Sequence, residues 1–110
     1  MADFNQLQEQ LKDSLVKLGS KEWGAYREAA EKDAAAFLQQ TRADLERWAQ
    51  MLQSGQLSQD EFQWLLQAKK DSLQMEALKH AGLAKVALDG FSKDLLTTLG
   101  QVLPRWAANG

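Results

Sequence analysis

Residues 53–62 read QSGQLSQDEF, and this stretch contains the signals of one helix ending and the next beginning. Gly55 suits the left-handed backbone conformation that closes a helix. Ser58 and Glu61 have the spacing of a capping box, in which the Ser58 hydroxyl accepts from the Glu61 amide and the Glu61 carboxylate reaches back to Ser58. The stretch therefore predicts a short turn between two helices that pack antiparallel.

Before this turn, apolar residues recur every three or four positions, which is the spacing of one helix face. This stripe consists of Trp23, Tyr26, Ala30, Ala34, Phe37, Thr41, Leu45, Trp48 and Leu52. It predicts a helix over about residues 21–53. Its alanines should allow a close approach to the facing helix, near the low end of the usual spacing between helix axes.

After the turn, a second stripe runs from Phe62 to Trp106 and predicts a helix over about residues 59–103. The phase of the stripe is kept across Gly82 and Gly90. We therefore expect one continuous helix, with these two glycines as the positions where it would bend. Proline cannot donate to the helical ladder, so this helix is expected to end at Pro104.

A third stripe lies at the start of the chain and consists of Phe4, Leu7, Leu11, Leu15 and Leu18. It predicts a shorter helix over about residues 3–18. The next stripe begins one position late, and such a shift rotates the apolar face by about 100°. We therefore expect a break at Gly19 and Ser20, and we expect this short helix to cover the outer part of the second long one.

The expected fold class is all-α, with a long antiparallel helical hairpin (about 21–53 and 59–103) and a shorter N-terminal helix (about 3–18). The chain has 110 residues, of which 45% are hydrophobic and 25% charged, as is usual for one folded domain over residues 1–110. Its net charge of -2 gives no general attraction to nucleic acid. The absence of cysteine excludes disulfides and thiol catalysis. Neither a secretory signal nor a long apolar run is visible, so a cytoplasmic location is expected.

The sequence contains one weak candidate for a metal site. Glu76 and His80 lie one helical turn apart, so both side chains could contact one ion. The chain has a single histidine, however, whereas a di-metal bundle needs Glu-x-x-His pairs on two helices. The other carboxylates lie beside basic residues, as Glu28 lies beside Lys32, which is typical of a solvated helix surface. We therefore expect no enzyme activity, no cofactor, no metal and no small-molecule substrate.

Apolar residues also remain off the main stripes, and between Leu83 and Leu99 they occupy more than half of the predicted helix circumference. An elongated hairpin cannot cover them all, and surplus apolar surface indicates a partner. The candidate interface residues are Trp64, Met75, Leu83, Val86, Leu96, Leu103 and Trp106.

These features favour a non-enzymatic structural or adaptor protein. In this hypothesis the hairpin associates with a second copy of itself, or binds another protein, through the apolar faces of the helix over 59–103. The alternative is a peripheral protein that binds a lipid or other hydrophobic surface with residues 83–106 as an amphipathic helix. Lys79, Lys85 and Lys93 would favour an anionic membrane, but Asp89 and Asp94 offset them.

Overall fold

The computed structural model describes residues 3–18 and 23–108, and all regular elements within them are helical. The prediction of an all-α fold is therefore confirmed. The break expected at Gly19 and Ser20 lies outside the described residues. In chain order the elements are α1 (Phe4–Leu18), the 3₁₀ turn η1 (Gly24–Tyr26), α2 (Arg27–Gln40), α3 (Arg42–Ser54), α4 (Gln59–Ala68), the 3₁₀ turn η2 (Lys70–Ser72), α5 (Glu76–His80) and α6 (Lys85–Ala108).

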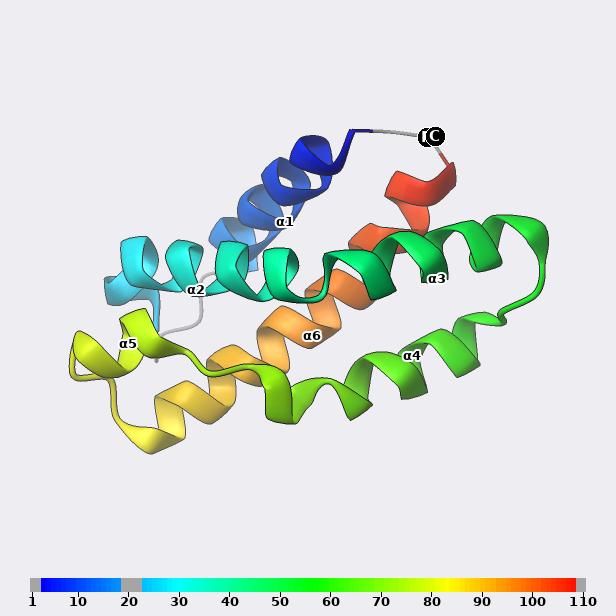
Figure 1. The fold of residues 1–110 in the computed structure, drawn as a ribbon. Coiled ribbons are helices and arrows are strands. Elements are labelled where there is room, and N and C mark those ends of the chain that lie inside the picture. Colours follow the sequence, from blue (N-terminus) through cyan, green and yellow to red (C-terminus); the bar gives the residue numbers. More distant parts are fainter. Residues whose placement is uncertain (1–2, 19–22, 109–110) are drawn as a thin grey trace.

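Helix α6 forms the centre of the fold, because α1, α3 and α4 all pack against it. Figure 1 shows α6 running diagonally across the fold and passing behind α3. Half of its residues are buried, since 12 of its 24 positions lie in the interior. Trp23, which precedes η1, also packs here: its indole Nε1 donates to Asp94 Oδ2 at 2.8 Å, and its ring meets Phe91 edge-on at 5.3 Å between centroids.

The N-terminal helix is found as expected, and α1 runs antiparallel to α6 and packs against it (Figure 1). Leu7, Leu11 and Leu15 on its inner face are buried. At its start, Trp106 Nε1 donates to the backbone carbonyl of Asp3 at 3.0 Å. The Trp106 ring also meets Phe4 edge-on at 6.2 Å between centroids. The two ends of the described chain are thus joined by one aromatic contact and one hydrogen bond.

The turn between α3 and α4 has the capping interactions that its sequence predicts. Gly55 adopts the left-handed conformation with φ 79°. The Glu61 amide donates to Ser58 Oγ at 3.1 Å, and the Ser58 amide donates to Glu61 Oε1 at 3.0 Å. On the two sides of the turn, the Trp48 ring of α3 and the Phe62 ring of α4 lie 6.2 Å apart between centroids. Both rings are buried, so this contact fixes where α4 begins to pack against α3.

The helix expected over 21–53 is divided, and its residues 21–22 lie outside the described part. Helix α2 begins at Arg27, after the 3₁₀ turn, and it is separated from α3 by a distorted residue, Thr41, with φ -102° and ψ 11°. The Thr41 hydroxyl donates to the Phe37 carbonyl four residues earlier at 2.7 Å. Such a bond competes with the helical ladder and bends a helix.

The prediction of one continuous helix over 59–103 is wrong. The chain leaves the helical conformation after Ala68, passes through η2 and an extended Leu73, and enters the short α5. It turns again at Gly82, whose φ of 90° is the reason a glycine suits this position. Across the second interruption the buried positions shift off the predicted stripe: Ala81 and Ala84 are exposed, whereas Leu78, Leu83 and Ala87 are buried.

Helix α5 is held by a buried carboxylate from α2. Asp33 is only 6% exposed, and its two oxygens accept from the backbone amides of Ala77 at 2.9 Å and Leu78 at 2.8 Å. These amides belong to the first turn of α5, where no helical carbonyl is available to them. The residue before α5, Met75, has a left-handed φ of 54°, which is unusual for a side chain of this size. The Asp33 carboxylate of α2 therefore caps the N-terminus of α5, a helix that is distant from it in the sequence.

The prediction that the last helix ends at Pro104 is also wrong, because α6 continues to Ala108. Proline has no N–H, so it leaves the carbonyl of Gly100, four residues earlier, without its helical donor. The side-chain amides of Gln59 and Gln63 on α4 donate to this carbonyl, each at 3.3 Å. A Cβ at position 100 would lie 2.6 Å from Gln63 Nε2, so a glycine there allows this approach. The fold thus satisfies the carbonyl with groups from α4.

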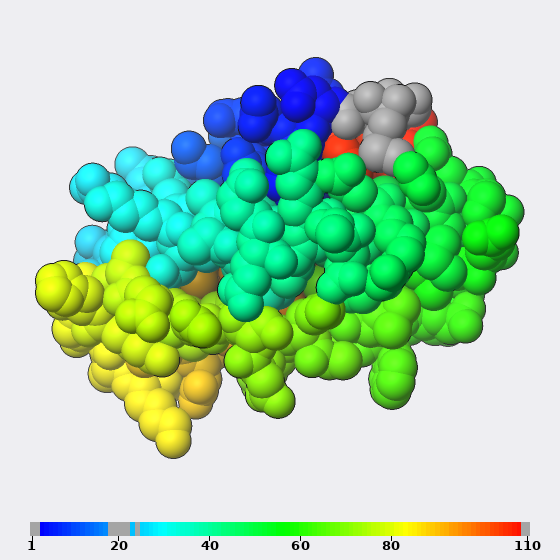
Figure 2. Space-filling view, viewed as in Figure 1, coloured from blue at the N-terminus to red at the C-terminus, as the bar shows by residue number. Residues whose placement is uncertain are grey.

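The fold is more compact than the elongated hairpin expected from the sequence. The described fold measures 42 × 23 × 21 Å, with a radius of gyration of 13.6 Å, where about 13 Å is typical of a compact domain of this length. The accessible surface is 6348 Å², close to the roughly 6,100 Å² expected for a compact chain of this mass. Figure 2 shows the side chains of α2 and α3 lying directly against those of α5 and α4. Most of the apolar surface that suggested a partner is therefore covered within the chain.

A matched pair of threonines tests the polar part of this core. Thr98 is 2% exposed, and its hydroxyl has no hydrogen-bond partner among the described residues, whereas the hydroxyl of the equally buried Thr41 is bonded. Removing an unpaired buried hydroxyl removes its desolvation penalty. We expect Thr98→Val to raise the free energy of unfolding by about 1 kcal/mol and Thr41→Val to lower it by about 1 kcal/mol, as measured by urea denaturation. A loss of stability in Thr98→Val as large as that in Thr41→Val would contradict this prediction.

The Asp33 cap leads to a second stability prediction. Replacing Asp33 with alanine leaves two backbone amides of α5 without their carboxylate, and hydrogen bonds to a charged group are worth roughly 1.5–3 kcal/mol each. We expect Asp33→Ala to lower the free energy of unfolding by about 2 kcal/mol or more, and Asp33→Asn, which keeps one acceptor, to lie between this variant and the wild type. Asp89→Ala, at an exposed position on α6, is the control and should change stability by less than about 0.5 kcal/mol. An Asp33→Ala variant as stable as the control would show that the cap does not hold α5.

Candidate interaction surface

The most exposed aromatic side chain of the described fold is Trp64, on α4. It is 72% exposed, whereas Trp23, Trp48 and Trp106 are all buried. Positions one turn before and after it on α4 share its side of the helix. We call this surface the Trp64 face, and its exposed residues are Asp60, Glu61, Trp64, Gln67 and Ala68.

The backbone beneath the Trp64 face is fixed by contacts on the opposite side of α4. Phe62 and Leu66 point into the core and are fully buried. Gln59 and Gln63 bind the Gly100 carbonyl of α6, as described above. Because both sets of contacts occupy the inner side of a single helix, they direct Trp64 outward. The position of this tryptophan follows from how α4 packs.

The Trp64 face is acidic at its N-terminal end. Asp60 and Glu61 occupy the first turn of α4, where carboxylates are favoured by the helix dipole. The backbone amide of Ser58, and then its hydroxyl, hydrogen-bond the Glu61 carboxylate and hold its pKa below the ordinary value of 4.5. Glu61 is therefore ionised at neutral pH, and one of its oxygens, Oε1, is already engaged with Ser58.

The other end of α4 is tied to α3 by ion pairs. Lys69 Nζ lies 2.6 Å from Asp44 Oδ2, and Arg47 donates to the other oxygen, Oδ1, at 2.8 Å. The hydrogen bond from Lys69 holds the pKa of Asp44 below its ordinary value of 3.8, although partial burial opposes the shift. Arg47 acts in the same direction as Lys69. Helices α3 and α4 are therefore joined here by ion pairs as well as by apolar packing.

The seven candidate interface residues fall into three groups in the structure. Four of them belong to the core, which corrects their expected exposure; they are Leu83, Leu96, Leu103 and Trp106. Met75 is half-buried. Trp64 and Val86 remain exposed, Val86 to 73%. Val86 lies in the first turn of α6, at the opposite end of the molecule from α4 (Figure 1), so the fold does not bring the two together.

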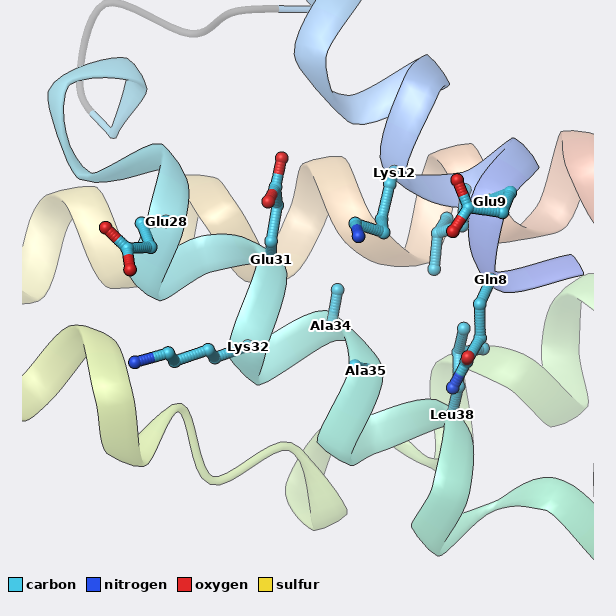
Figure 3. Close-up of a pocket in the computed structure, with 10 residues that line it drawn as sticks. Gln8, Glu9, Lys12, Glu28, Glu31, Lys32, Ala34, Ala35 and Leu38 are labelled. Atoms are coloured by element: carbon cyan, nitrogen blue, oxygen red, sulfur yellow. The ribbon is translucent and has the colours of Figure 1, made fainter. Parts of the chain in front are cut away.

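Two open grooves lie away from the Trp64 face. One, of about 280 Å³, lies between α1 and α2, and Figure 3 shows its charged side chains spread along it without converging on one point. They are Glu9, Lys12, Glu28, Glu31 and Lys32. The other, of about 410 Å³, lies between α2 and α5 and is lined by four alanines, with Tyr26 and His80 beside them. Among the described residues, neither groove is lined by a serine, threonine or cysteine.

Glu76 and His80 both lie on α5, and both are exposed. Within residues 3–18 and 23–108, no three side chains of the types that ligate metals gather closely enough to hold an ion. None of the described helices combines the length and the apolar character that crossing a bilayer requires.

Comparison with known proteins finds no matching family model, no matching curated protein and no matching solved structure.

The ion pairs that tie α4 to α3 give a pH-dependent prediction. A carboxylate whose pKa is lowered by folding adds stability above its unfolded pKa, and this stability is lost as the pH falls through the folded pKa. The free energies of unfolding of the wild type and Asp44→Asn should therefore differ by a constant amount at pH 5–7. For partly exposed groups we expect less than about 1 kcal/mol. Below about pH 4 the difference should shrink, as measured by urea denaturation across pH 3–7.

Lys69→Met provides the control for this measurement. In that background the stabilising contribution of Asp44 should be small at every pH, because its main partner is gone. If the difference in free energy of unfolding between the wild type and Asp44→Asn stays constant down to pH 3, the Asp44 carboxylate is not stabilised by its ion pairs.

Proposed function

We propose that this protein is a non-enzymatic adaptor or structural protein that binds a protein partner through the Trp64 face. The observation that carries the proposal is the 72% exposure of Trp64 on a helix whose other side is firmly packed. Tryptophan is among the residues most enriched at the energetic centres of protein interfaces. A side chain of this size buries about 150–250 Å² on docking, which at about 25 cal/mol per Å² corresponds to roughly 4–6 kcal/mol of transfer free energy.

Two features of α4 make it suitable as a docking element. Its backbone is held by the Ser58 cap, by the glutamine bonds to α6 and by the buried Phe62, so little ordering entropy is lost on binding. Its exposed side offers one large aromatic with small and polar neighbours, among them Ala68 and Gln67. A partner can therefore approach the ring closely.

Self-association and lipid binding both lose the apolar surface that favoured them. Self-association is favoured by the surplus apolar residues, most of them between Leu83 and Leu99, and most of that surface lies in the core. Lipid binding by the same segment was motivated in the same way, and the apolar side of α6 already packs against α1, α3 and α4. The Trp64 face lies outside residues 83–106 and remains exposed, and its acidic residues would repel an anionic membrane.

A peptide-display selection tests the proposed function. Peptides are selected from a random library on the full chain, after depletion on Trp64→Ala, and their affinities are measured by isothermal titration calorimetry. We expect binders whose affinity falls at least tenfold on Trp64→Ala, because the change removes the anchor. Val86→Ala, at an equally exposed site on α6, should change affinity less than twofold. Recovery of only those peptides that bind Trp64→Ala as tightly as the wild type would overturn the proposal.

The fold of the test variant is checked separately. Trp64 is mostly in solvent, so Trp64→Ala should change the free energy of unfolding by less than about 0.5 kcal/mol. A lost affinity then reports on the surface and not on stability.

A further inference from the structure

The chemistry around Trp64 defines what kind of side chain it would bind. Helical side chains lean toward the N-terminus, so Trp64 leans over the turn that carries Asp60 and Glu61. Those residues precede it by four and three positions, which places them on the same side of α4, at about 5–6 Å between Cβ atoms. All three are exposed. An aromatic ring and two carboxylates therefore share one small area.

Both carboxylates retain capacity for a partner. No hydrogen bond or ion pair within the described residues engages the side chain of Asp60. Glu61 accepts from the Ser58 amide at Oε1, and its side chain is exposed, so its carboxylate can also accept from a ligand. A cation that reached this area would meet negative charge and, on the indole, the negative face of an aromatic ring.

The same chain already builds this combination elsewhere, between α1 and α3. The guanidinium of Arg42 lies over the ring of Phe4 at 4.7 Å from its centroid, while its Nε lies 2.6 Å from Glu46 Oε1. Guanidinium groups suit this arrangement because they are planar, stack on aromatic rings and present several donors to a carboxylate. An ammonium group acts as a point charge and is more strongly hydrated.

We infer that the Trp64 face binds an arginine-bearing basic segment of a protein partner, with the guanidinium over the Trp64 indole and paired with Asp60 and Glu61. This inference rests on the proposed function and specifies the chemistry of the partner. Tryptophan is the strongest of the aromatic residues in cation–π contacts. Opposite charges across the interface also increase the rate of encounter, so binding should weaken as the salt concentration rises.

The test uses the peptides recovered with Trp64 dependence. We expect them to share an arginine, and replacing it with citrulline, which is planar but uncharged, should weaken binding at least tenfold. Lysine at that position should bind with intermediate affinity. Absence of arginine from the Trp64-dependent peptides, or full affinity of the citrulline peptide, would overturn the inference while leaving the proposed function standing. Loss of Trp64 dependence itself would overturn both.

The double variant Asp60→Asn and Glu61→Gln tests the carboxylates. Glutamine at position 61 can still form the capping box, so α4 should remain folded while both charges are removed. We expect this variant to bind the arginine peptide about tenfold more weakly at 50 mM salt, with a smaller difference at 500 mM.

The matched control removes two charges from other surfaces. The control is the double variant Asp13→Asn and Asp89→Asn, which changes the net charge by the same amount. Asp13 lies on α1 and Asp89 on α6, and both are exposed. This control should bind within twofold of the wild type. Equal weakening in both double variants would mean that net charge, and not the Trp64 face, attracts the peptide, and it would overturn the inference.

Discussion

The burial of α6 against α1, α3 and α4 is the constraint on which the rest of the structure depends. A helix that is covered on several sides must pack apolar residues around most of its circumference, which explains the breadth of apolar residues after Leu83. Pro104 adds a further requirement, because it frees the Gly100 carbonyl inside this packed helix. Gln59 and Gln63 of α4 satisfy it. The same contacts fix α4 on α6 and leave Trp64 on the outside.

The interruptions between α4 and α6 have a geometric reason. A continuous helix over residues 59–103 would be about 68 Å long, at 1.5 Å per residue, and the longest dimension of the fold is 42 Å. Such a rod would leave most of its apolar surface in water. Breaking it lets α6 turn back across α3 and α4. The breaks expose backbone amides, and the first turn of α5 recovers two hydrogen bonds from Asp33.

This arrangement divides the apolar residues into those that build the core and the few that remain available to a partner. Trp106, at the end of α6, is one of the apolar residues that the sequence offers as interface candidates. In the fold it lies against Phe4 and binds the Asp3 carbonyl. Trp64 differs because it falls outside the apolar stripe of its own helix, and no other element of the described fold covers it. The distinction between the two depends on contacts between distant residues.

Local sequence by itself determined the helical fold class, the range of α1, and the turn from Gly55 to Glu61, because apolar periodicity and capping depend on residues a few positions apart. It also placed Trp64 outside the core stripe. Tertiary structure alone decided where the second half of the chain breaks and which apolar residues are covered. The bond from Asp33 to the start of α5 spans 44 residues, and neither partner has a local signal that names the other. Periodicity shows which side of a helix is apolar, but only the packing of the whole chain decides what that side meets.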